Sequence, residues 1–205
     1  MSGDPKGPSS RAMDAFRVHG GVLRTRQALA AGIHPRTLYE LRDAGAIEVV
    51  SRGVYRLAGR DWGIDPDVLA VACRVPRAVL CLTSALSFHD LTTQIPRGVD
   101  LALPPGGSSP RFTEPPIRVH RFSGASMTEG VESRSIDGVR VRLYCAEKTI
   151  ADCFKFRNKI GLDIALEALR LYWSRRRQDL PSLMRYAKVD RVDAVMRPYI
   201  EAMLL

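Results

Sequence analysis

The sequence HPRTLYELRDA, at residues 34–44, carries side chains that could read DNA by hydrogen bonding. Arg36 can pair with guanine O6 and N7 or with a phosphate, and Tyr39 and Glu40 can reach base edges. If this segment begins a helix, the backbone N–H groups near Arg36 and Thr37 would suit a phosphate. The candidate DNA contacts in this segment are His34, Arg36, Thr37, Tyr39 and Glu40.

Three further arginines lie near this segment in the sequence. Arg52 falls in an Arg-Gly turn, from which its side chain could enter a minor groove or touch a phosphate. Arg24 and Arg26 could hold the flanking DNA backbone. The alternative is that all these side chains are merely solvated, and the acidic Glu40 and Asp43 would repel phosphate.

Three short helices and a hairpin would position these side chains. Apolar spacing, capping residues and an Arg-Gly turn predict the elements. They are helices over residues 10–18, 25–31 and 34–44, and strands over 47–50 and 54–57. Leu38 and Leu41 fall on the inner face of the third helix. This order predicts a winged helix-turn-helix domain over residues 10–60, after a disordered tail at 1–9.

A turn-rich stretch at residues 60–67 predicts a domain boundary, with a second domain over 66–205. The expected strands cover residues 78–82, 99–103, 117–122, 133–136 and 139–144. The expected helices cover 68–73, 84–91, 147–157, 163–175, 181–187 and 191–203. The predicted class is α+β. The winged helix-turn-helix is followed by a C-terminal domain with a small, mainly antiparallel sheet and a helical bundle.

The charge of the chain indicates a polyanionic or acidic partner. The net charge is +9, and residues 1–60 hold 10 Lys and Arg against 5 Asp and Glu. No apolar run is long enough for a membrane span, and the first residues do not form a signal peptide. We therefore expect a cytoplasmic protein with no membrane partner.

The sequence contains no recognisable catalytic or metal-binding motif. Phosphate-binding loops, zinc-protease, serine-hydrolase and protein-kinase patterns are all absent from it. The four cysteines are scattered through apolar runs, which favours buried, reduced thiols. We therefore predict no catalytic residue, no metal and no cofactor.

The predicted helix at residues 147–157 has an apolar stripe that includes Ile150 and Phe154. Four polar residues of this helix lie outside the apolar stripe. They are Lys148, Asp152, Lys155 and Arg157. One interpretation is a core helix with a solvated charged face. The other is a contact surface for an acidic partner.

Four stretches in fixed order resemble the AbiEi family of antitoxins, of bacterial type IV toxin–antitoxin systems. They are GGVLRTRQALAAGIHPRTLYELRDAGAIEVVSRGVYRLAG, LCLTSALSFHDLT, VDLALP and AEKTIADCFKFRNKIGLDIALEALR. The resemblance implies an N-terminal repressor domain that binds operator DNA and a C-terminal domain that neutralises a nucleotidyltransferase-like toxin. On this basis we expect toxin-facing residues in the second and fourth stretches. They are Ser84, His89, Lys148, Asp152, Lys155 and Arg157.

The resemblance leaves the mechanism of neutralisation open. One alternative is an atypical kinase that phosphorylates the toxin, which would need ATP and Mg²⁺. Another is a docking module that sequesters the toxin without chemistry. On DNA, either a homodimer or a monomer on tandem sites is compatible with the sequence.

Overall fold

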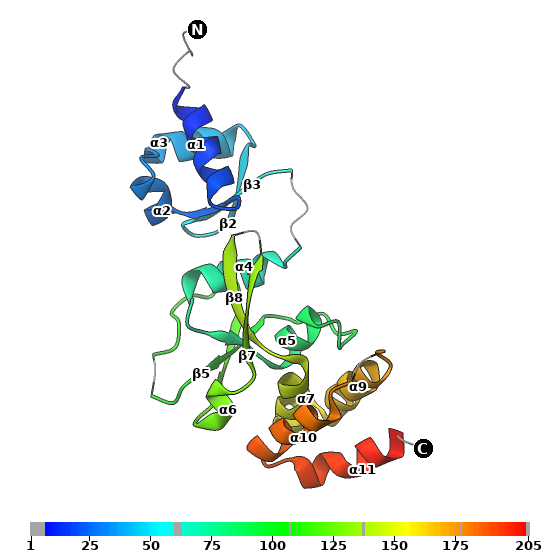
Figure 1. The fold of residues 1–205 in the computed structure, drawn as a ribbon. Coiled ribbons are helices and arrows are strands. Elements are labelled where there is room, and N and C mark those ends of the chain that lie inside the picture. The colour runs from blue at the N-terminus through cyan, green and yellow to red at the C-terminus, as the bar shows by residue number, and fades with distance from the viewer. Residues whose placement is uncertain (1–6, 60–62, 107, 137, 177, 204–205) are drawn as a thin grey trace. The chain divides into compact units, whose positions relative to one another are not determined.

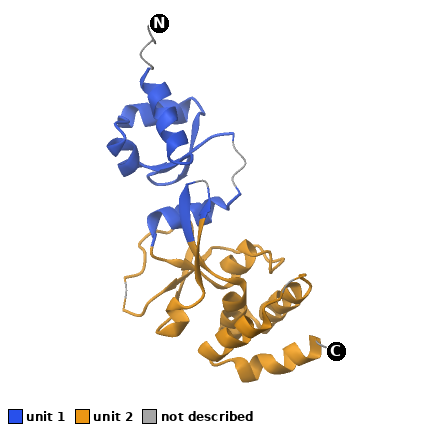
Figure 2. Ribbon diagram, in the orientation of Figure 1, with its two compact units in different colours: residues 1–76, 135–141 blue, residues 77–134, 142–205 orange. Residues whose placement is uncertain are grey.

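The structure is a computed structural model that describes most of the chain (Figure 1). The described residues are 7–59, 63–106, 108–136, 138–176 and 178–203. The chain divides into two compact units (Figure 2). Unit 1 comprises residues 1–76 and 135–141, and unit 2 comprises residues 77–134 and 142–205.

Unit 1 contains the three predicted helices, a fourth helix and a three-stranded sheet. These are α1 (Pro8–Val18), β1 (Val22–Arg24), α2 (Thr25–Ala30), α3 (Pro35–Asp43), β2 (Ile47–Ser51), β3 (Val54–Leu57) and α4 (Pro66–Arg74). The sheet order is β1-β3-β2, with antiparallel pairing throughout. The sequence analysis did not predict β1, because three residues are too few to show an alternating pattern.

The core of unit 1 forms where the inner faces of the helices meet the sheet. Leu38 and Leu41 of α3 are buried against Phe16 of α1 and Ile47 of β2. This confirms the inner face expected for α3. Of the predicted tail, residues 1–6 lie outside the described part of the chain, and Pro8 already begins α1.

The division between the units falls later than the predicted boundary at residues 60–67. Helix α4, expected to begin the second domain, groups instead with unit 1, where it contacts β2. Its apolar side chains, including Leu69 and Val71, are buried. Within the predicted boundary, residues 60–62 lie outside the described part of the chain.

Unit 2 combines a sheet with a set of helices. Its elements are β4 (Val79–Leu80), α5 (Leu82–Phe88), β5 (Val99–Leu103), β6 (Ile117–Arg121), α6 (Ala125–Thr128), α7 (Ala146–Lys155), α8 (Arg157–Ile160), α9 (Leu162–Trp173), α10 (Leu180–Val189) and α11 (Asp193–Met203). Strands β7 (Val131–Ile136) and β8 (Val139–Tyr144) extend the sheet, and their tips group with unit 1. The predicted α+β class is confirmed.

The sheet of unit 2 is mixed, in the order β6-β5-β4-β8-β7. Strand β4 pairs antiparallel with β5, whereas β5 pairs parallel with β6 and β4 pairs parallel with β8. The sequence analysis expected a mainly antiparallel sheet. The parallel β5–β6 pair arises because the connection at residues 104–116 carries the chain back along the sheet before β6 begins.

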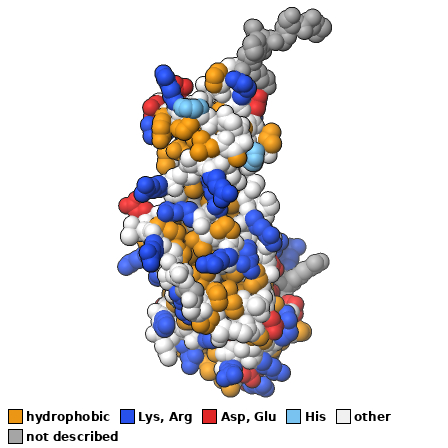
Figure 3. All heavy atoms as spheres, turned by 90° about the vertical axis from the view of Figure 1, so that its left-hand side faces the viewer, with side chains coloured by type: hydrophobic (Ala, Val, Ile, Leu, Met, Phe, Trp, Pro, Cys, Tyr) orange, Lys and Arg blue, Asp and Glu red, His pale blue; other side chains and the backbone are white. Residues whose placement is uncertain are grey.

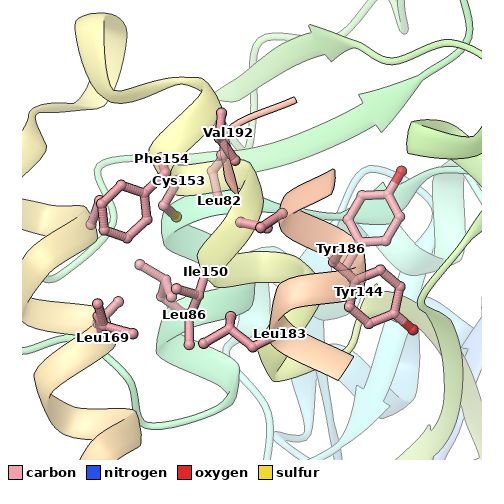
Figure 4. Close-up of a cluster of buried hydrophobic side chains, with 14 of the residues drawn as sticks. Leu82, Leu86, Tyr144, Ile150, Cys153, Phe154, Leu169, Leu183, Tyr186 and Val192 are labelled. Carbon is pink, nitrogen blue, oxygen red and sulfur yellow. The ribbon is translucent and has the colours of Figure 1, made fainter. Parts of the chain in front are cut away.

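The helices of unit 2 enclose a second apolar core. Figure 4 shows Ile150 of α7 among Leu86 of α5, Leu169 of α9 and Leu183 of α10. The predicted apolar stripe of Ile150 and Phe154 is therefore confirmed as buried. No helix among the described residues is both long and apolar enough to cross a membrane.

Candidate nucleic-acid interface

The first turn of α3 is capped by the side chain of His34. The Arg36 backbone N–H donates to His34 Nδ1 at 3.2 Å, and the Thr37 N–H donates to the His34 carbonyl at 3.0 Å. Both N–H groups are therefore satisfied within the protein. The expectation that they would bind a phosphate is wrong, because the imidazole cap already occupies the helix start. Thr37 is also buried.

The exposed face of α3 carries Arg36, Tyr39 and Glu40. The Arg36 side chain is 82% exposed, and its Nε donates to Glu40 Oε1 at 2.9 Å. Tyr39 is half exposed, and the Arg42 guanidinium lies 5.1 Å from the centre of its ring. The helix therefore presents an aromatic ring and an ion pair to solvent, groups able to contact base edges.

A backbone contact joins the hairpin turn to the start of α2. The Thr25 N–H donates to the Gly53 carbonyl at 2.9 Å, and Gly53 adopts a left-handed conformation with φ of +75°. Arg26 and Arg52 are adjacent in sequence to the two residues that form this contact. Both are exposed, and neither forms an ion pair with a described residue. They are suited to bind phosphate.

Arg24 has a different environment from the other two arginines. It is only partly exposed, and its charge lies close enough to the thiol of Cys73 to affect the pKa of that group. Burial raises the pKa of that thiol, and the nearby Arg24 opposes the increase. The side chain of Arg24 therefore faces partly toward the protein interior.

Figure 3 shows that Lys and Arg side chains outnumber acidic ones on one face of the molecule.

Removing the His34 cap is expected to destabilise unit 1. His34→Ala should lower the free energy of unfolding by about 1 kcal/mol, since loss of an N-cap acceptor costs roughly 0.5–2 kcal/mol. His34→Asn supplies another side-chain acceptor and should retain most of the stability. Urea unfolding of both variants checks this. Equal losses in the two variants would show that the cap does not contribute.

The two predicted toxin-facing residues near α5 have structural contacts. Ser84 is buried and accepts a hydrogen bond from the Asp100 backbone N–H at 2.8 Å. His89 Nε2 lies 2.8 Å from the Tyr144 carbonyl. The expectation that Ser84 faces a partner is wrong, because the residue lies inside unit 2.

Two of the residues expected to form a contact surface on α7 are buried instead. Lys148 and Asp152 are both 0% exposed, and the Lys148 ammonium donates to Asp152 and to Asp190 Oδ2, the latter at 3.0 Å. The ammonium also lies 4.7 Å from the centre of the Tyr144 ring. These polar residues are buried because α10 ends against α7 and brings Asp190 to them.

Lys155 and Arg157 lie nearer the surface. Lys155 is 34% exposed and donates to Ser126 Oγ at 2.8 Å and to Asp190 Oδ1 at 3.1 Å. Arg157 donates to the Phe154 carbonyl at 2.8 Å. These two remain predicted toxin-facing residues. The sequence analysis missed Asp190, since no local pattern connects it with a lysine on α7.

The pKa values of the two buried carboxyls in this cluster shift in opposite directions. Burial raises the pKa of Asp152 well above its usual range, and Asp190 adds to the increase while Lys148 opposes it. Burial also acts to raise the pKa of Asp190, but the nearby Lys148, Asp152 and Ser126 lower it overall. Asp190 accepts hydrogen bonds from Lys148, Lys155 and Ser126, whereas the buried Oδ2 of Asp152 has no hydrogen-bond partner among the described residues.

A second buried carboxylate, Asp100, accepts hydrogen bonds from polar side chains of α5 and β6. Arg118 donates to both of its oxygens at 2.8 Å, His120 Nε2 donates to Oδ1 at 2.8 Å, and Thr83 also donates. Burial acts to raise the pKa of Asp100, but the hydrogen bonds from His120, Thr83 and Arg118 outweigh it and lower the pKa. The sequence analysis did not identify this cluster.

Acid is expected to destabilise unit 2 through Asp100. Because its pKa is lowered in the folded state, its contribution is complete above the ordinary value of 3.8 and is lost as the pH falls through the lower folded value. Asp190 has the same sign, whereas the raised pKa of Asp152 acts in the opposite direction at higher pH. Asp100→Asn should therefore make the free energy of unfolding, measured in urea, less dependent on pH below about pH 4. An unchanged pH dependence in that range would contradict the assignment.

The fold of unit 1 defines its class. Three helices, a small antiparallel sheet with a hairpin turn, and a third helix with an exposed polar face form a winged helix-turn-helix domain.

The comparisons with known proteins agree with that class. Residues 10–58 match a family described as "Transcriptional regulator, AbiEi antitoxin". No curated protein matches the chain. Among solved structures, the RV2827C protein from Mycobacterium tuberculosis is similar, with a TM-score of 0.55 and 16% sequence identity. The similarity covers 99% of this chain and 82% of that one, and at this identity it concerns the fold alone.

Proposed function

We propose that the protein is an antitoxin and transcriptional autorepressor of a type IV toxin–antitoxin system, acting in the cytoplasm. Unit 1 binds operator DNA upstream of its own gene. Residues of unit 2 neutralise a cognate nucleotidyltransferase-type toxin. The observation that carries the proposal is the match of residues 10–58, which form the winged helix, to a family of antitoxin regulators. The exposed face of α3 and the exposed arginines Arg26 and Arg52 support it.

Repression and neutralisation can be tested separately in cells. A reporter fused to the protein's own upstream region should be repressed by the full chain. Arg26→Ala/Arg52→Ala should relieve that repression, because both arginines bind phosphate in the proposal. The same double variant should still rescue growth against the cognate nucleotidyltransferase-type toxin. Absence of repression by the wild-type chain would contradict the regulator role.

Once growth is rescued, co-purification and the mass of the toxin identify the mode of neutralisation. A stable co-purified complex would indicate sequestration. An increase in toxin mass on incubation with this protein, ATP and Mg²⁺ would indicate phosphorylation. Failure to rescue growth at all would contradict the antitoxin role.

A further inference from the structure

An acidic residue on the exposed face of α3 needs a physical explanation in a DNA-binding helix. Glu40 is more than half exposed, and a carboxylate there repels phosphate. Glu40 lies one helical turn after Arg36 and accepts from its Nε at 2.9 Å. An exposed pair of this kind contributes little to folding stability. The position of Glu40 therefore points to a role in binding.

The geometry of the Arg36–Glu40 pair leaves the Nη groups of Arg36 and one carboxylate oxygen of Glu40 available to bind. Nε of Arg36 is engaged by Glu40, so its two terminal Nη groups remain as a planar fork. That fork matches the O6 and N7 acceptors of guanine, and the second oxygen of Glu40 matches the N4 amino donor of cytosine. Neither set of atoms has another hydrogen-bond partner among the described residues.

We propose that Arg36 and Glu40 act as one base-reading unit, in which Arg36 contacts a guanine and Glu40 contacts a cytosine. This proposal rests on the proposed operator binding and adds its specificity. Glu40 positions the Arg36 fork by holding Nε, which keeps the guanidinium from turning to the phosphates. Because the pair is close to neutral, it contributes base discrimination, whereas Arg26 and Arg52 supply attraction to the backbone.

Selection from a randomised duplex library tests the proposal with the full chain. The wild-type protein should enrich a site with a preferred guanine and a preferred cytosine. Glu40→Gln should bind the same site but lose about tenfold of its preference for that cytosine. Asp43→Asn is the matched control, since Asp43 is also exposed on α3 but pairs with the adjacent Arg42 at 2.8 Å. It should leave the preferences unchanged.

The outcomes separate this inference from the proposed function. If Glu40→Gln and wild type enrich identical sites with equal preferences, the base-reading role of Glu40 is overturned while operator binding stands. If the wild-type protein enriches no sequence, operator binding fails and the inference fails with it. A general loss of affinity in Glu40→Gln without a change in base preference would also overturn the inference.

Discussion

Lys148→Met is expected to lower the free energy of unfolding of unit 2 by about 3–5 kcal/mol, because it removes one partner from a buried ion pair. The Lys148 ammonium is 0% exposed and donates to Asp190, whose carboxylate is equally buried. Methionine fills much of the space but leaves the Asp190 charge without its closest buried cation. Urea or thermal unfolding measures the loss.

Lys155→Met is the matched control for this prediction. Lys155 lies on the same helix and contacts the same carboxylate, but its side chain is 34% exposed. Its ion pair is partly screened by solvent, so the expected loss is about 1 kcal/mol or less. Equal losses from the two variants would contradict the view that burial makes Lys148 the critical cation.

The double variant Arg26→Ala/Arg52→Ala is expected to weaken DNA binding and reduce its dependence on salt. Each phosphate contact contributes about 0.9 to the slope of log affinity against log salt concentration, so the slope should become shallower by about 1.8. The two arginines are exposed, and each is adjacent in sequence to a residue of the Thr25–Gly53 contact. Titrations of one DNA duplex at several salt concentrations measure the slope.

A charge-matched control separates this effect from a general loss of positive charge. Arg170 and Arg176 are exposed residues of unit 2 that lie outside the winged helix. Replacing both by alanine removes the same charge and should leave the slope unchanged. A slope that changes equally in both double variants would show that binding depends on net charge alone.

The fold was most predictable where local patterns are strong. Strands β5 and β8 begin and end where apolar periodicity predicts, and α3 follows its proline and inner leucines. The elements that were missed, β1, α6 and α8, are only a few residues long. Their formation depends on pairing and packing partners that are distant in the sequence.

The candidate site was predictable only in part. Exposure of Arg36, Tyr39 and Glu40 follows from helical spacing, because Leu38 and Leu41 fix the inner face. On α7 the same argument failed for Lys148. Helical spacing correctly placed it off the Ile150 stripe, but it cannot show that α10 covers that side and supplies Asp190.

The clusters around Asp100 and Asp190 show why buried polar contacts are difficult to predict from the sequence. Arg118 is 18 positions from Asp100, and Lys148 is 42 positions from Asp190. Such pairs are brought together by tertiary packing, and their residue types alone also suit an exposed surface. Of the four polar residues of the predicted helix at residues 147–157, the structure therefore places Lys148 and Asp152 in a buried ionic cluster, where neither a solvated face nor a contact surface was correct for them.

Affinity of the full chain for its own upstream DNA, compared with a shuffled duplex of equal length and composition, tests the central claim most directly. We expect the native sequence to be bound more tightly by at least about 10³-fold at physiological salt, the lower end for specific regulators. Equal affinity for the two duplexes would contradict the claim that unit 1 reads an operator.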